Sequence, residues 1–460
     1  MTRPRWPWGV VVGAATLLGA LALVKVAGTD IPFQDQWDAE GGQLYPAWQA
    51  GTLHVTDLLR AHNEHRIVWT RLLALALFVG DGQWDPLLQL AVNAVLRAVM
   101  AVVCWWAVTR EVPESWRPWT AAGWALAFLP HLAWHNVLWG FQSQVYFSIM
   151  FSVLALVWLG TGTPTPARRA AGLAAGGAAL LAMGSGALVP VALLGCEAVR
   201  QIGRRQFDRA RFWPALVLLA IAWGLRPAAP PAGLAILQST QAGQFLRAWL
   251  RALAWPHTGQ PLAALVLNAP LAWWMIARAR GREAATAGGE AAALVGGWAV
   301  LLAAAMAWTR GGSGEWIAGV PSRYADFLVF LPLANAWCGG GWVRQVAGPA
   351  RRWRRGAAVA WALFLAVGWI GLSAEAMQRV ILPRARDREA PVRLAVALQQ
   401  SGDPAILAGQ PRLLSPHPNP AIVLAVLHDP RLRGRLPPSL QPGRPLGAAS
   451  RWTRAILGRQ

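Results

Sequence analysis

The stretch WGVVVGAATLLGALALVKVA at 8–27, followed by DIPFQDQWDAEGGQLYPAWQAGTLHVTDLLRAHNEHR at 30–66, decides the fold that the sequence predicts. The first part is apolar over about the 20 residues that a helix needs to cross a bilayer. We therefore expect a membrane-spanning helix that leads into a polar loop at the level of the lipid headgroups. This loop gathers acidic groups and imidazoles, namely Asp30, Asp35, Asp38, Glu40, Asp57, Glu64, His54, His62 and His65.

The composition of the whole chain extends this expectation. The chain has 460 residues, of which 55% are hydrophobic and only 14% are charged. Its apolar runs are rich in Ala and Leu and show no alternation of polar and apolar residues, which argues against membrane strands. The sequence thus predicts an all-α, polytopic helical membrane protein. Tryptophans near the ends of the runs match the aromatic belts of such proteins, for example Trp6, Trp8, Trp105, Trp106, Trp116, Trp119, Trp337 and Trp342.

The formal net charge of +21 comes almost entirely from arginine, because Lys25 is the only lysine. These arginines lie in short clusters between the apolar runs and do not form one continuous basic segment. Clusters of this kind set the orientation of a membrane protein and attract anionic headgroups. We therefore expect membrane lipids as partners and no nucleic acid.

About eleven membrane spans are expected from the apolar runs. The Gly-Ser-Gly segment at 184–186 divides the run 170–199 into two short spans or a re-entrant pair. Arg3 and Arg5 precede the first span and predict a cytoplasmic N-terminus. The expected spans are 8–27, 86–108, 118–132, 145–160, 170–199 as two, 212–225, 261–277, 289–308, 327–342 and 357–372.

Two regions follow from this pattern. Residues 1–375 are expected to form a transmembrane domain, with 29–85 as its first outer loop. Residues 376–460 are rich in Pro and Arg and are expected to form a C-terminal tail domain. Because an odd number of spans separates this tail from a cytoplasmic N-terminus, the tail is expected on the same outer face as the loop. The helices expected in these two regions lie at 38–50, 57–79, 390–400 and 420–427.

The expected topology gathers further polar groups on the outer face. No Gly-rich phosphate-binding motif opens a helix, so a nucleotide-linked donor has no predicted site. A donor at the outer face would therefore arrive already carried by a lipid. The polar groups expected beside the first loop are His131, His135, Asn136, Gln142, Gln144, Arg310, Glu315, Arg323, Tyr324 and Asp326.

Four segments resemble landmarks of the GT-C class of membrane glycosyltransferases. They are PFQDQWDAE at 32–40, HNEHRI at 62–67, NVLWGFQSQ at 136–144 and PSRYADF at 321–327. The resemblance covers the membrane part and rests more on layout than on strict motifs. It implies a GT-C-like fold in the bacterial inner membrane. It also implies transfer of a sugar from a polyprenyl-phosphate-linked donor to an envelope glycan or lipid acceptor at the outer face.

The same resemblance implies that an acidic residue of the first outer loop acts as general base or metal ligand. This role falls on Asp35 or Asp38, although the adjacent Asp-Glu pair usual in that class is absent. Sugar transfer with inversion independently needs a carboxylate that accepts the proton of the acceptor hydroxyl. Two carboxylates three positions apart share one side of a helical turn and can hold a divalent cation such as Mg²⁺ or Mn²⁺. The alternative is a pair of solvated charges at a helix N-terminus.

Two polar segments are candidates for substrate binding. Glu64, His65 and Arg66 directly precede an apolar helix and are expected to bind hydroxyls or a phosphate. The alternative is an ordinary polar start of an interfacial helix. Gln142 and Gln144 follow an aromatic segment and are expected to bind sugar hydroxyls, with an ordinary interfacial turn as the alternative.

Arg323 and Tyr324 open an apolar helix after a Gly-rich loop. The planar guanidinium of Arg323 is expected to clamp a phosphate with two parallel hydrogen bonds, and Tyr324 is expected to contact the same substrate. The alternative is an interfacial arginine whose charged end only reaches the headgroup region.

Two other functions remain open at this point. A transporter or flippase of a lipid-linked saccharide would carry ionisable residues within its spans and paired broken helices. Here Arg97 is the clearest charged residue within a span, and the polar groups gather on one face. A non-catalytic membrane scaffold would tolerate any substitution in the acidic loop. The one-sided polar face favours the enzyme.

Overall fold

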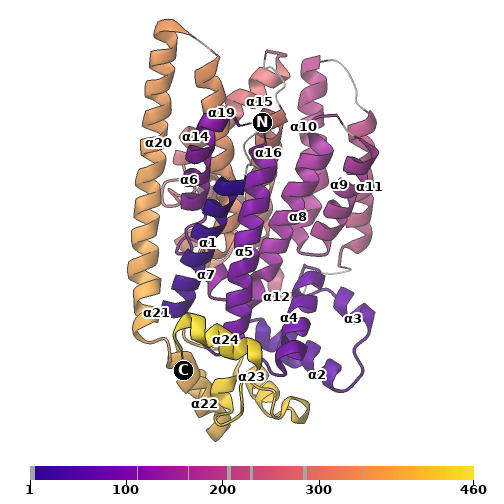
Figure 1. The fold of residues 1–460 in the computed structure, drawn as a ribbon, viewed down its shortest axis with the longest axis vertical. Coiled ribbons are helices and arrows are strands. Elements are labelled where there is room, and N and C mark those ends of the chain that lie inside the picture. Colours follow the sequence, from indigo (N-terminus) through magenta and orange to yellow (C-terminus); the bar gives the residue numbers. More distant parts are fainter. Residues whose placement is uncertain are drawn as a thin grey trace.

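In a computed structural model, the chain folds as an array of helices that run mainly along the longest axis of the molecule (Figure 1). The structure describes residues 6–110, 112–163, 165–204, 209–227, 232–282, 287–345 and 347–459. Within these ranges the regular structure is helical and no strand occurs. Arg3 and Arg5, on which the expected orientation of the N-terminus depends, lie outside the described residues.

Six helical stretches of the described chain are long and apolar enough to cross a membrane. The described chain is thus helical, as predicted, and holds helices that could cross a membrane, whereas the count of about eleven spans is not confirmed. Two expected spans are shorter or interrupted helices, namely α6 (Arg117–Ala127) in 118–132 and α15 (Ala269–Ala279) in 261–277, whereas α11 (Arg209–Leu225) covers the whole expected span 212–225. The six stretches are Pro7–Ala27, Pro86–Val108, Gly140–Gly160, Gly184–Gly203, Gly288–Arg310 and Gly348–Arg386.

The interruption expected within 170–199 is present between α9 (Pro166–Leu180) and α10 (Leu188–Arg204). Gly186 lies in the connecting turn, where a Cβ atom would come within 2.4 Å of the Ala179 backbone. Only glycine allows the two segments to approach this closely. Gly186 therefore serves close packing of the turn.

The long helices pack around one large apolar core. α1 (Trp6–Ala27) lies against α5 (Pro86–Val108), and α8 (Ser143–Gly160) lies against α9. α16 (Ala287–Arg310) packs on α10, α13 (Ala242–Leu253) and α19 (Phe330–Arg344). The aromatic centre of this core is Phe330, whose ring lies 5.9–6.1 Å from the rings of Trp124, Phe128 and Trp298.

The first loop contains four short elements. They are a π-helical segment at Trp37–Leu44, α2 (Tyr45–Gln49), α3 (Val55–Leu59) and α4 (Val68–Asp81). The helix expected at 38–50 is thus confirmed, but the single helix expected at 57–79 is wrong.

The interruption between α3 and α4 is a tight backbone turn. His62 and His65 exchange backbone hydrogen bonds of 2.8 and 2.9 Å, and Asn63 has a φ of 52°. Asn is one of the few residues that tolerate this left-handed conformation. The polar HNEHR run therefore lies in a turn between α3 and α4, at the end of the bundle.

The C-terminal region returns to the end of the bundle where the first loop lies (Figure 1). α20 (Gly348–Ala376) runs along the edge of the bundle and leads into α21 (Leu382–Arg386). α22 (Ala390–Ser401) and α23 (Pro420–Leu427) confirm the two expected tail helices. α24 (Ala448–Leu457) was not expected and lies across the ends of α1 and α5.

The first loop and the C-terminal region share one apolar core. Trp37, Tyr45 and Trp84 from the loop pack in the same cluster as Leu398 and Val426 from the tail. The ring centroids of Trp37 and Trp84 lie 5.5 Å apart, and those of Tyr45 and Trp84 lie 5.4 Å apart. Burial of several large side chains from both regions stabilises the contact, since each contributes about 1.5–3 kcal/mol. We refer to the two regions together as the cap.

Arg454 of α24 fastens the cap to the start of the loop. Its guanidinium lies 2.9 Å from Asp30 and also pairs with Asp85, and both carboxylates are largely buried. Burial and the nearby charge of Asp85 raise the pKa of Asp30 to about 7, although Arg454 acts in the opposite direction. Asp30 therefore has a structural role.

The shared core makes a clear prediction for membrane topology. Ala50 in the loop and Gln410 in the tail are exposed at one end of the molecule, and Ala350 is exposed near the start of α20. With the orientation expected from the arginine clusters, Ala50→Cys and Gln410→Cys will react with an impermeant maleimide in intact cells. Ala350→Cys will react only after permeabilisation. The parent protein, whose Cys104 and Cys338 are buried, measures the background labelling. Labelling of Ala50→Cys and Gln410→Cys from different sides would contradict the shared core.

Candidate functional site

A polar cavity of about 440 Å³ lies between the cap and the end of the helix bundle. Its walls come from the first loop, the turn after α6, the start of α8, the α9–α10 turn, the end of α16 and the segment before α19. Seven of the nine candidate site residues line it: Asp35, Glu64, His65, Gln142, Gln144, Arg323 and Tyr324. Asp38 and Arg66 are not among the lining residues.

Asp35 is held at the cavity by an unusual backbone conformation. The preceding Gln34 has a φ of 51° and donates its backbone N–H to the Pro416 carbonyl at 2.8 Å. The Asp35 carboxylate lies 3.5 Å from His62 Nε2, and about a third of its side chain (35%) is exposed. A partly exposed carboxylate beside an imidazole is suited to accept a proton from a ligand.

Asp38 points to the tail rather than into the cavity. Its carboxylate lies 3.0 Å from Nε2 of His417, whose side chain is 8% exposed. Burial alone would lower the pKa of His417, but the hydrogen bond to Asp38, the Asn419 carbonyl and the nearby Asp35 raise it above the usual value. This pair links the loop to the C-terminal region.

Glu64 and His65 form one charged wall of the cavity. Arg310 pairs with the Glu64 carboxylate, which also lies 3.6 Å from His65 Nε2. The Gly184 N–H donates to His65 Nδ1 at 3.2 Å, so a neutral His65 carries its proton on Nε2. Burial is the main reason that the pKa of His65 is lowered, and Arg310 adds to it against the effect of Glu64. His65 is therefore a neutral hydrogen-bonding group at pH 7.

Arg66, the next residue in the sequence, contacts backbone carbonyls instead of the cavity. Its Nε donates to the Leu225 carbonyl at 2.6 Å, and its Nη1 donates to the Leu59 carbonyl. These bonds tie the turn of the first loop to the end of α11. Arg66 thus fixes the loop that carries Glu64 and His65, and the structure does not bring it to the cavity wall.

Arg323 belongs to a second charged group at the cavity. Its guanidinium lies 2.6 Å from Glu315, which also pairs with Arg412 from the tail. Burial would raise the pKa of Glu315, but Arg323, Arg412 and Arg310 outweigh it and hold that pKa below the usual value. The Arg323 guanidinium also lies 5.0 Å from the Tyr324 ring centroid. Three arginines of the site, Arg310, Arg323 and Arg412, therefore share two carboxylate partners, Glu64 and Glu315.

A buried network holds the segment that carries Arg323. Arg97 of α5 pairs with Asp326 at 2.7 Å, and the two side chains are 1% and 2% exposed. Asn136 donates from Nδ2 to Asp326 at 2.9 Å and to the Arg323 carbonyl at 3.0 Å. Arg97 also donates to the Phe128 carbonyl at 2.8 Å. Arg97, the clearest charged residue within an expected span, is thus part of the network that supports the site.

Several buried polar atoms around the cavity have no hydrogen-bond partner among the described residues. A buried polar atom without a partner costs about 1–3 kcal/mol, so such a cluster is suited to a ligand with many hydroxyls. Trp139 and Phe141 add aromatic surface to the same wall, with ring centroids 5.9 Å apart. The atoms are Nε2 of His62, Oε2 of Glu64, Nε2 of His135, Nε1 of Trp139 and Oε1 of Gln144.

The expected divalent cation was tested against the side chains present. Across the described residues, no group of three or more His, Cys, Asp or Glu side chains is arranged to hold a metal ion. Asp35 and Asp38 instead have separate histidine partners, His62 and His417. A cation held by Asp35 and Asp38 therefore stays a prediction, and no chemical step is derived through it.

Reasoning from the sequence missed the contribution of the tail. Arg412 lines the cavity and His417 pairs with Asp38, yet both lie in a Pro-rich segment without a recognisable motif. Their positions depend on the shared core of the cap, which no local pattern predicts. Arg310 was expected on the outer face, but its pairing with Glu64 was not.

The described residues thus form a helical protein with helices long and apolar enough to cross a membrane and with a polar site at one end. Comparison of the chain with known protein families, with curated proteins and with solved structures found no match.

The buried ion pair predicts a large effect on stability. Asp326→Leu leaves Arg97 buried without a counter-charge and is expected to lower the free energy of unfolding by about 3–5 kcal/mol. The double variant Arg97→Met, Asp326→Leu is expected to regain most of that loss, because no unpaired charge remains. Denaturant unfolding of the purified protein measures both. Glu375→Gln removes an exposed pair with Arg379 and serves as control, with an expected change of about 0–1 kcal/mol. Equal losses in the single and double variants would contradict this account.

The Asp38–His417 pair predicts a pH dependence of the cap. The pKa of His417 is raised in the folded protein, so the pair stabilises the fold below the ordinary histidine pKa of about 6.5. This contribution is lost as the pH rises through the raised pKa. As the pH rises above about 6.5, thermal stability should therefore fall by more in the parent than in Asp38→Asn. His428→Gln, at an exposed tail histidine, is the control. An unchanged pH dependence in Asp38→Asn would contradict the stabilising role of the Asp38–His417 pair.

Proposed function

We propose that the protein transfers a sugar from a polyprenyl-phosphate-linked donor to an envelope glycan or lipid acceptor. The observation that carries this proposal is the meeting of Asp35 with Arg310, Arg323 and Arg412 in one cavity. A carboxylate and a group of arginines are the two charge types that transfer from a phosphate-linked sugar needs. The resemblance of the sequence to GT-C glycosyltransferases points to the same chemistry.

The proposed reaction assigns each charged group one task. The Asp35 carboxylate accepts the proton of the acceptor hydroxyl while the hydroxyl oxygen forms a bond to the anomeric carbon. The bond from that carbon to the phosphate oxygen breaks, and polyprenyl phosphate leaves with the electron pair. Arg323 and Arg310 offset the negative charge that grows on the phosphate. His62, 3.5 Å from Asp35, orients the carboxylate and offsets its charge when protonated.

The remaining wall of the cavity suits a lipid-carried donor. Leu188 of α10 and Leu302 and Met306 of α16 add apolar side chains from the helix bundle to the lining. An isoprenoid chain against these side chains would bring its phosphate toward the arginines and its sugar toward Gln142 and Gln144. A divalent cation near Asp35 and Asp38 remains part of the proposal, and loss of activity with EDTA is its test.

A transporter of a lipid-linked saccharide is the second candidate function. The charged pair Arg97–Asp326 inside the bundle and the broken helix at α9–α10 favour it, because transporters use both features. A non-catalytic scaffold is the third. Both differ from the enzyme in one respect, since neither needs a proton acceptor at Asp35.

Substitution of Asp35 tests the enzyme directly. Asp35→Asn keeps size and polarity but accepts a proton poorly, so sugar transfer should fall by about 10²–10⁴-fold. Asp38→Asn should give a smaller loss, because its carboxylate faces His417 outside the cavity. The measurement is transfer from polyprenyl-phosphate-linked sugars to acceptor in membranes that hold equal amounts of each variant.

Asp57→Asn is the matched control. Asp57 lies in the same loop, but it caps α3 through the His54 N–H at 2.9 Å and does not line the cavity. Its replacement should leave transfer unchanged. Full activity in Asp35→Asn with a dead Asp38→Asn would move the base to Asp38. Full activity in both variants and in their combination would rule out a catalytic role of this loop. The transporter or the scaffold would then be the remaining functions.

A further inference from the structure

A long apolar groove lies between α19 and α20, near the end of the bundle opposite the polar cavity. Tyr324 and Phe327, which precede α19, line the polar cavity, and the last turns of α19 line the groove. The groove has a volume of about 1230 Å³. Its walls are almost entirely apolar and include Leu265, Val266, Trp273, Val359 and Phe364.

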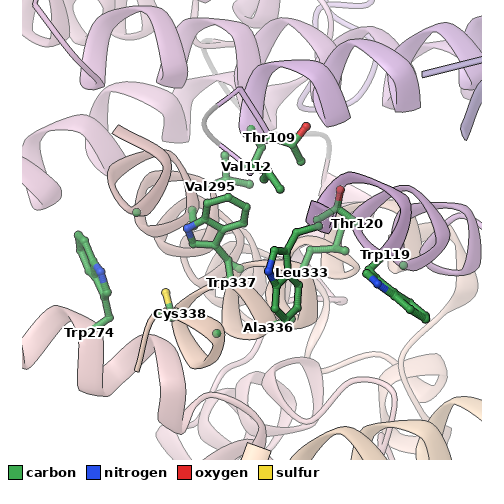
Figure 2. Close-up of a pocket in the computed structure, with 18 of the residues that line it drawn as sticks. Thr109, Val112, Trp119, Thr120, Trp274, Val295, Leu333, Ala336, Trp337 and Cys338 are labelled. Carbon is green, nitrogen blue, oxygen red and sulfur yellow. The ribbon is translucent and has the colours of Figure 1, made fainter. Parts of the chain in front are cut away.

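A second cavity adjoins the groove along α19. It has a volume of about 590 Å³ and is rich in aromatic side chains from α6, α15 and α19, among them Trp119, Trp274 and Trp337 (Figure 2). We call it the aromatic cavity. Ala336, Gly340 and Arg344 line both the groove and the aromatic cavity. These residues are four positions apart on α19 and share one helix face, so the two spaces meet along that face.

Three arginines stand at the open end where the two spaces meet. Arg344 lines both spaces, and Arg351 and Arg355 line the groove. No carboxylate lines either space, and within the described chain none of these arginines forms an ion pair. The neighbouring Arg354 differs, because it donates to the Trp342 carbonyl at 2.7 Å and stacks over the Trp342 ring.

The arginines lie where α20 changes from polar to apolar. The helix begins with the sequence GPARRWRR at 348–355 and continues with apolar residues. Val359, Leu363 and Val367 are 58–65% exposed, as expected for side chains that face lipid. Arginines at such a boundary reach the level of the lipid phosphates.

We propose that this end of the protein binds one anionic phospholipid with two acyl chains from the surrounding bilayer. Arg344, Arg351 and Arg355 hold its phosphate. One chain lies in the groove between α19 and α20, and the other lies in the aromatic cavity. Two apolar spaces that meet at a single arginine fit two acyl chains on one glycerol phosphate, whereas a polyprenyl phosphate has one chain.

The lipid gives α20 a contact that the protein itself largely lacks. Only 6% of the most apolar part of the Gly348–Arg386 stretch is buried within the protein. α20 leads into the tail. Arg412 of the tail lines the polar cavity, and His417 of the tail pairs with Asp38 of the first loop. A lipid between α19 and α20 therefore supports the helix that connects the bundle to the tail.

The test is a titration of the purified full chain with phosphatidylglycerol and phosphatidylcholine, followed by native mass spectrometry. The parent should bind one phosphatidylglycerol in preference to phosphatidylcholine. The triple variant Arg344→Gln, Arg351→Gln, Arg355→Gln should bind it roughly 100-fold more weakly, at about tenfold or less per arginine. Size-exclusion profiles and melting temperatures establish that each variant is folded.

A second triple variant controls for total charge. Arg280, Arg282 and Arg352 are exposed arginines near the same end and line neither space. Their replacement by Gln removes the same charge and should leave the affinity unchanged. An equal loss in both triple variants would overturn the specific site and indicate general electrostatic attraction.

Two further measurements test whether the two acyl chains of the lipid occupy the groove and the aromatic cavity. Ala358→Trp fills the groove without changing any arginine and should weaken phosphatidylglycerol binding by about tenfold, the effect of 1.4 kcal/mol. Lysophosphatidylglycerol, which has one chain, should compete poorly. Unchanged binding in Ala358→Trp, displacement by inorganic phosphate, or equal binding of undecaprenyl phosphate would each overturn the two-chain site.

Discussion

The ion pair between Arg97 and Asp326 is the constraint on which the polar site depends. Its two side chains are 1% and 2% exposed, and a single charge buried there would be very unfavourable. The pair therefore fixes the position of α18 (Ala325–Leu328) relative to α5. Asn136 extends the network to the backbone of Arg323. Through these contacts, a charge that looks out of place in a membrane helix holds the arginine wall of the cavity.

The cap is the second constraint, and it joins residues that are far apart in the chain. Trp37 and Trp84 of the loop share a core with Leu398 and Val426 of the tail. Arg454 adds a buried charge link to Asp30 and Asp85. Because of this packing, the tail is part of the site rather than an appendage. Asp38 finds its partner His417 only when both halves of the cap are in place.

Patterns of single helices were predictable from the sequence, and contacts between helices were not. The run 86–108 and the tail segment 420–427 have the bounds that their apolar patterns predict. By contrast, the expected span 261–277 is interrupted at Asn268, whose Nδ2 donates to the Leu253 carbonyl at 2.8 Å. Asn335 also donates to Asn268 Oδ1 at 3.2 Å. Partners so distant in sequence leave no periodic signal.

The same distinction applies to the candidate site. Gln142 and Arg323 line the cavity because they lie next to helix starts that meet on one face, and Asp35 lines it from the loop that follows α1. Asp38 and Arg66 have equally suggestive sequence positions, yet each finds a nearer partner, His417 in one case and two backbone carbonyls in the other. Which polar group is left to face a ligand depends on tertiary contacts, and composition carries no information on them.

The arrangement of the two ends bears on the choice between enzyme and transporter. Carboxylates, imidazoles and arginines gather at the polar cavity, whereas the groove at the other end has arginines alone. Between them lies the packed aromatic cluster of Trp298, Phe327 and Phe330, with ring centroids 6.0 and 6.1 Å apart. All three side chains are at most 1% exposed. A saccharide that crossed the bundle here would have to pass this apolar layer without hydrogen-bonding partners, at a cost of several kcal/mol. Chemistry confined to one end avoids that barrier, which favours transfer of a sugar over its transport.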